Sequence, residues 1–122
     1  MTKPKAWTAE TIAIGSELLL GGRVDTNSLY IADCLATCGV ELRYKTVVGD
    51  DLPDMVAVLK TAARRARVVI ITGGLGPTVD DLTREAVAEA TGHRLVRRTA
   101  ALDEMTARLA QWGRTPTKSQ FR

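Results

Sequence analysis

The chain has 122 residues, of which 45% are hydrophobic, and a formal net charge of +3. This length suits one domain with a buried core, and no shift in composition marks a second domain. No apolar run approaches the ~20 residues of a membrane span, so we expect a soluble, cytoplasmic protein. The modest positive charge is compatible with an anionic small molecule. Because the few aromatic residues do not alternate with the basic clusters along the chain, nucleic acid is not an expected partner.

The first half of the chain predicts two strands and two helices behind a polar tail over residues 1–10. Residues 11–15 are short, apolar and β-branched at alternate positions, which predicts a first buried strand. A long loop with helix-capping residues then leads into a helix that ends at about Cys38, before Gly39. Alternation over residues 40–48 predicts an edge or near-edge strand. A further helix follows, with Pro53 in its first turn.

The second half is centred on residues 68–71, four consecutive β-branched residues that predict a strand buried on both faces at the centre of a sheet. A glycine loop over residues 72–77 connects it to a helix expected from about Asp81 to Thr91. Residues 94–96 suggest a short strand, and a last helix is expected over about residues 100–111. The remaining residues have no assignable pattern.

Strands that alternate with helices in this way predict an α/β fold. We expect a single domain over residues 11–122, with a three-layer, doubly wound, mostly parallel sheet flanked by helices. In such sheets ligands bind beyond the carboxyl ends of the strands. Three loops leave strands by these ends, at residues 15–27, 49–51 and 72–81. The three loops should therefore share one edge of the sheet.

The glycine loop is the first candidate site. Its free backbone amides and the amino end of the following helix favour an anion such as phosphate. The candidate phosphate-binding residues of the loop are Thr72, Gly73, Gly74, Gly76 and Pro77. The loop matches neither the Walker motif nor a dinucleotide-binding fingerprint. The alternative interpretation is a tight turn that needs glycine for its shape alone.

Asp50 and Asp81 are candidates for a metal site, because they lie in two loops on the same predicted edge. Two carboxylates repel a phosphate unless a divalent cation bridges them, which favours magnesium or a similar metal. The metal would activate a water molecule that attacks phosphorus. The alternative role for both aspartates is helix capping, and Thr78 with Asp81 matches a capping box.

The first loop supplies further candidate binding residues, namely Gly15, Glu17, Asp25 and Asn27. Asn27 suits a base or ribose, and Glu17 suits a metal or a sugar hydroxyl, with a plain surface role equally open for Glu17. Cys34 and Cys38 are four residues apart in a predicted helix. Since there is no second cysteine pair, we expect them to pack in the helix interface rather than bind zinc.

Three motifs, IAIGSELLLGGRVDTNS, VVGDD and ITGGLGPTVDDLTREA, occur in this order between about Thr11 and Val96. Together they resemble the amino-terminal domain of the CinA (competence/damage-inducible protein A) family, which belongs to the wider molybdopterin-binding family. The resemblance implies a parallel sheet flanked by helices. It also implies that Asp50 and Asp81 match the two functional aspartates of relatives that insert molybdate or adenylylate molybdopterin.

The resemblance further implies that Gly73, Gly74, Gly76 and Thr83 match the loop that holds the pterin phosphate. Members similar to CinA are associated with metal-dependent hydrolysis of ADP-ribose and similar nucleotide diphosphates, using Mg, Mn or Co. Three functions follow as expectations: such a hydrolase, a molybdopterin-binding or adenylylating protein, and a non-catalytic binding module. The fold also implies a homo-oligomer. Family domains continue for several tens of residues past the equivalent of Gln120, so this sequence resembles a domain truncated at its C-terminus.

Overall fold

The computed structural model describes residues 6–121, which form strands, α-helices and two short 3-10 helices. The elements in chain order are β1 (Thr8–Ile14), η1 (Ser16–Leu19), α1 (Thr26–Thr37), β2 (Glu41–Val48), α2 (Leu52–Arg65), β3 (Val68–Thr72), α3 (Thr83–Thr91), α4 (Thr99–Gln111) and η2 (Lys118–Phe121). None of the helices over residues 6–121 is long and apolar enough to cross a membrane.

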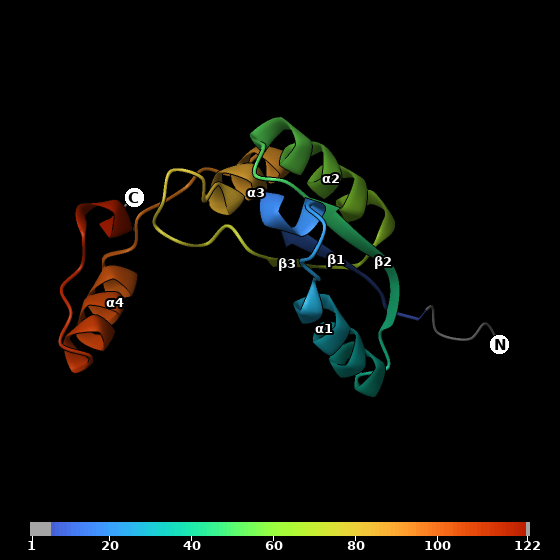
Figure 1. Cartoon of the computed structure of the whole chain (residues 1–122), viewed down its shortest axis with the longest axis horizontal. Helices are drawn as coiled ribbons and strands as arrows, with labels where there is room; N and C mark the ends of the chain where they lie inside the picture. Colours follow the sequence, from blue (N-terminus) through green and yellow to red (C-terminus); the bar gives the residue numbers. More distant parts are fainter. Residues whose placement is uncertain (1–5, 122) are drawn as a thin grey trace.

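The three strands form a parallel sheet in the order β2-β1-β3. Helix α1 lies on one face of this sheet, and α2 and α3 lie on the other (Figure 1). At the carboxyl ends, Ile14 is level with Val48, and Ala13 is level with Thr72. This register brings the three predicted loops to one side of the sheet, which we call the carboxyl edge. The prediction of a doubly wound α/β fold is confirmed.

Strand β1, rather than β3, takes the central position. Its side chains are buried, with Ala9 and Glu10 both 0% exposed, whereas β3 is half-buried and pairs with β1 alone within the described sheet. The prediction that residues 68–71 lie at the centre was therefore wrong. Four β-branched residues favour burial, but they do not fix the number of neighbouring strands. Since β1 begins at Thr8, the last residues of the predicted polar tail are also strand.

The core lies between the sheet and the α2–α3 layer. Its fully buried members include Ile12 from β1 and Met55 from α2, and Ala86 of α3 packs against the same cluster. Helix α1 covers the other face less deeply. Leu29 of this helix is 51% exposed, and Ile31, Ala32 and Leu35 are half-buried. Cys34 and Cys38 are likewise exposed, so the prediction that they pack in an interface was wrong.

The last third of the chain departs further from the predictions. Residues 94–96, expected as a short strand, are exposed and have no regular structure. Helix α4 forms as predicted but contains no buried residue. It stands away from the sheet together with η2 (Figure 1). No strand in the described sheet pairs with residues 94–96, so the prediction of a short strand there was wrong.

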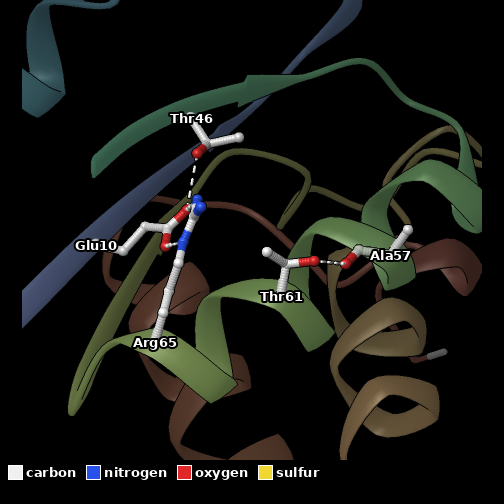
Figure 2. A network of polar contacts seen from close by, with 5 residues as sticks. All are labelled: Glu10, Thr46, Ala57, Thr61 and Arg65. Carbon is white, nitrogen blue, oxygen red and sulfur yellow. Dashed lines mark hydrogen bonds and ion pairs between the residues drawn. The ribbon is translucent and has the colours of Figure 1, made fainter. Parts of the chain in front are cut away.

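A buried ion pair fixes the opposite end of the sheet, which we call the amino edge (Figure 2). The Glu10 carboxylate accepts hydrogen bonds of 2.8 Å from Nε and Nη2 of Arg65 and from the Thr46 hydroxyl. These bonds hold the pKa of Glu10 below its usual value, mainly through Arg65 and despite burial. The pair ties β1 and β2 to the last turn of α2. It explains how a glutamate is accommodated in a buried strand.

Candidate functional site

The first and second loops are joined by reciprocal hydrogen bonds at the carboxyl edge. The Ser16 amide donates to Oδ2 of Asp50 at 3.0 Å, and the Asp50 amide donates to the Ser16 hydroxyl at 2.9 Å. The α2 N-cap is Asp51, whose carboxylate accepts from the Asp54 amide at 3.0 Å. The capping alternative for Asp50 was therefore wrong. Its carboxylate is held between β1 and β2, half-buried and bonded to one backbone amide.

Sequence reasoning missed Ser16 as a site residue. The signal is a small hydroxyl side chain directly after the glycine that ends the first strand. The Gly15 amide still bonds to β2, donating to the Val48 carbonyl at 2.9 Å. Because glycine has no side chain, Ser16 supplies the first side chain beyond β1. Ser16 positions Asp50, and so belongs to the candidate site.

The glycine loop crosses directly over the end of β1. Gly73 has a φ of 89°, and a Cβ atom at this position would lie 2.0 Å from the Ile14 carbonyl oxygen. Gly74 has a φ of 65°, and its Cβ would lie 2.1 Å from the Thr83 hydroxyl oxygen. Only glycine meets both requirements, for conformation and for space. The third loop therefore joins the other two at the carboxyl edge, as the sequence predicted.

Thr83 holds the glycine loop in place. Its side chain is only 4% exposed, and its hydroxyl donates to the Gly73 carbonyl at 2.7 Å, while its amide lies 3.3 Å from the Gly74 carbonyl. A hydroxyl hydrogen used in this way is not available to a phosphate. Thr83 therefore positions the loop, and its match to the phosphate-binding loop of the family stays a prediction.

We expect Thr83→Val to lower the free energy of unfolding by about 1–2 kcal/mol, because it leaves the Gly73 carbonyl without its donor. Thr83→Ser should keep most of the stability. Thr61→Val is the matched control, since the exposed Thr61 hydroxyl bonds to Ala57 within its own helix at 3.0 Å (Figure 2). Urea unfolding checks the order of the three variants. Equal loss in Thr83→Val and Thr61→Val would contradict the assigned role.

Asp81 closes a turn before α3. Its Oδ2 accepts from the Thr78 amide at 2.9 Å and from the Thr78 hydroxyl at 2.6 Å, and its amide donates to the Thr78 carbonyl at 3.1 Å. The expected Thr78–Asp81 pair therefore forms, but it does not cap a helix, because α3 begins at Thr83 with Leu82 as its N-cap. The carboxylate lies beside Gly76, where a Cβ would be 2.8 Å from Oδ2.

The other first-loop candidates have different surroundings. Asp25 is the N-cap of α1 and accepts from the Ser28 amide at 3.1 Å, so it has a structural role. Asn27 is exposed in the first turn of α1. Glu17 is exposed in η1 and folds over Gly15, where a Cβ would lie 2.6 Å from its Oε1. Of these three, Glu17 is placed beside the end of β1.

A cavity of about 200 Å³ opens beside the glycine loop. Gly76 and Pro77 form one side, Arg84 of α3 lies next to them, and Met105 of α4 and Gln120 of η2 complete the lining. The two C-terminal elements therefore border the loop, although they stand away from the sheet. This brings a basic and an amide side chain close to the two candidate loop residues.

Residues 10–120 match the model of a protein family described as "Probable molybdopterin binding domain". The chain belongs to this molybdopterin-binding domain family. A CinA-like protein of Acidobacterium capsulatum is 51% identical over 102 residues, which cover 84% of this chain and 25% of that protein. A CinA-like protein of Nostoc is 45% identical over 112 residues, 92% of this chain and 26% of that protein. This molybdopterin-binding domain thus spans about a quarter of these relatives.

Solved structures agree with this assignment. The crystal structure of the protein CinA from Thermoplasma acidophilum, a protein of unknown function, is 31% identical and superposes with a TM-score of 0.80 over 95% of this chain and 68% of that chain. The tungsten cofactor synthesizing protein MoaB from Pyrococcus furiosus is 30% identical, with a TM-score of 0.63 over 71% of this chain and 54% of that chain. The resemblance to CinA and the molybdopterin-binding fold are therefore confirmed.

Proposed function

We propose that the carboxyl edge binds the phosphate groups of a nucleotide and supports metal-dependent hydrolysis of a nucleotide diphosphate such as ADP-ribose. The observation that carries this proposal is the convergence of the loops. The glycine loop presses against Ile14, and Ser16 holds Asp50 beside the same strand end. The backbone amides of Gly73 and Gly74 are candidate donors to a phosphate, while the side-chain positions of both glycines face Ile14 and Thr83.

The donor set suits a metal that is bound together with its substrate. No group of three or more His, Cys, Asp or Glu side chains over residues 6–121 is arranged to hold a metal ion. Magnesium commonly uses one or two carboxylates together with substrate phosphates and water, and Asp50 and Asp81 can supply that number. When bound, such a metal neutralises phosphate oxygens and activates water. The chain's own residues position the diphosphate and the carboxylates.

Turnover of ADP-ribose tests this proposal. With magnesium, manganese or cobalt present, we expect release of AMP and ribose 5-phosphate, and loss of this activity with a chelator. Asp81→Asn should reduce turnover at least about tenfold, because it removes a metal-binding charge but keeps an oxygen for Thr78. Asp80→Asn is the matched control, since Asp80 is the exposed neighbouring residue, and it should keep full activity. Full activity of Asp81→Asn would refute the mechanism.

A second candidate function is molybdopterin binding or adenylylation, which the family description and the similarity to MoaB favour. It would use the same glycine loop for the pterin phosphate. Calorimetry with a pterin phosphate and with ADP-ribose separates the two functions. Binding of the nucleotide alone would exclude the pterin function. Nucleotide binding without turnover under any of the three metals would identify a non-catalytic binding module instead.

A further inference from the structure

The amino edge carries a basic pocket, at the opposite end of the sheet from the glycine loop. Its cavity of about 390 Å³ is lined by residues 63–67, at the end of α2 and just before β3, and by Ala6, Thr8 and Arg43. Four of the lining residues are arginines: Arg43, Arg64, Arg65 and Arg67. In sequence the first is distant from the others, so only the fold brings the four together.

The positive charge of this pocket is only partly neutralised. Arg65 is paired with Glu10, and Arg43 forms an exposed ion pair with Glu41 at 3.2 Å. Among residues 6–121, Arg64 and Arg67 have no acidic partner. Arg64 offsets the negative end of the α2 dipole, but this effect is equivalent to about half a charge. The pocket therefore keeps an excess of positive charge.

Aromatic rings hold two of the guanidinium groups in place. The Arg65 guanidinium lies 3.6 Å from the centre of the Tyr44 ring, and that of Arg67 lies 4.3 Å from the centre of the Trp7 ring. Stacking of this kind limits the motion of the guanidinium plane and does not use its N–H groups. The Arg67 N–H groups can therefore bind an anion, whereas Arg65 already donates through Nε and Nη2 to Glu10. Donors held in this way lose less entropy when a ligand binds.

We propose that this amino-edge pocket binds a small phosphate-bearing anion, of the size of a diphosphate. Guanidinium groups match phosphate oxygens through paired hydrogen bonds, and the two unneutralised arginines offset much of the negative charge of such an anion. A nucleic acid is less well suited, because its regularly spaced phosphates require an extended basic stripe, whereas this charge is confined to one pocket at the end of the sheet. The site is independent of the proposed function, which uses the carboxyl edge.

Trp7 provides a local reporter for the test. The chain has two tryptophans, so Trp112→Phe, a change at the exposed end of α4, leaves Trp7 as the single tryptophan, which is excited selectively over tyrosine. The probe is inorganic pyrophosphate, titrated at constant ionic strength. We expect a saturable change in Trp7 emission, because the bound ligand accepts hydrogen bonds from the Arg67 guanidinium that is stacked against the ring. Phosphate bound at the glycine loop lies at the far end of β1, roughly 20 Å away, and should not reproduce this change.

Arg64→Gln, in the same single-tryptophan protein, should weaken pyrophosphate binding about tenfold, since it removes one charge-assisted contact. Arg114→Gln removes the same charge beyond α4 and should leave binding unchanged. Calorimetry measures the affinity of each variant for pyrophosphate, and thermal unfolding checks that each variant keeps its fold. Three results would overturn the proposal: an emission change equalled by chloride, equal affinity of Arg64→Gln and the parent, or tighter binding of a single-stranded oligonucleotide that strengthens with its length.

Discussion

Replacing Gly73 by alanine is expected to lower the free energy of unfolding by about 3 kcal/mol or more. Two costs add at this position. The backbone has a φ of 89°, which side chains rarely adopt, and the new methyl group would lie 2.0 Å from the Ile14 carbonyl oxygen. That oxygen belongs to the backbone of the central strand, so it cannot move aside without disturbing β1. Either the loop lifts from β1 or the sheet distorts.

Gly92→Ala separates these two costs. Gly92 also has a positive φ, 70°, but a Cβ there meets nothing within 4 Å, so only the conformational cost of about 1 kcal/mol applies. Denaturant unfolding of both variants measures the difference, which reports the contact with Ile14. If Gly73→Ala proved as stable as Gly92→Ala, the close crossing of the glycine loop over β1 would be wrong. Ligand binding at the carboxyl edge should be lost in Gly73→Ala alone.

The second large effect is expected from Arg65→Met. This change leaves the Glu10 carboxylate, which is 0% exposed, without its cation, and breaking a buried ion pair in this way commonly costs about 3 kcal/mol. We expect a smaller loss than in a fully enclosed pair, because the Arg65 side chain is 36% exposed and water can enter in its place. The double variant Glu10→Met/Arg65→Met should recover most of the lost stability.

The same pair predicts a dependence of stability on pH. The folded state holds the pKa of Glu10 below its usual value, so it binds this proton less readily than the unfolded chain. The stabilisation is therefore complete above the ordinary glutamate pKa of about 4.3 and is lost as the pH falls through the lowered folded-state pKa. Unfolding measured from about pH 7 to about pH 3 should show a shallower loss in the double variant than in the parent. Parallel curves would contradict this account.

Local sequence patterns predicted the elements well and their neighbours less well. Pro53 in a first turn and Gly39 after a helix are local signals, and α2 and α1 follow them. The start of β1 has no such local signal. Glu10 interrupts the apolar pattern of this strand, and Arg65, which neutralises Glu10, is 55 positions away. No window of sequence contains both residues. The start of β1 was placed after Glu10, at residue 11, for this reason.

The candidate site shows the same limit. The arrival of the three loops at one edge follows from parallel topology, and it was predicted. The hydrogen-bond partners of individual side chains were not predicted. Asp50 is bonded to Ser16 from another loop, and the adjacent Asp51 takes the cap that both could have supplied. Likewise, the stacking of Trp7 on Arg67 joins residues from different segments, so a basic and an aromatic side chain meet in space although they are far apart along the chain.

The central place of β1 determines how cooperatively the molecule unfolds. Strands β2 and β3 both pair with β1, and each is backed by helices on the sheet. Neither side can detach without exposing buried β1 residues, so the sheet and its helices should lose structure together. Helix α4 buries no residue and is free of this constraint. The protein therefore combines one all-or-none unit with a C-terminal helix that can melt separately.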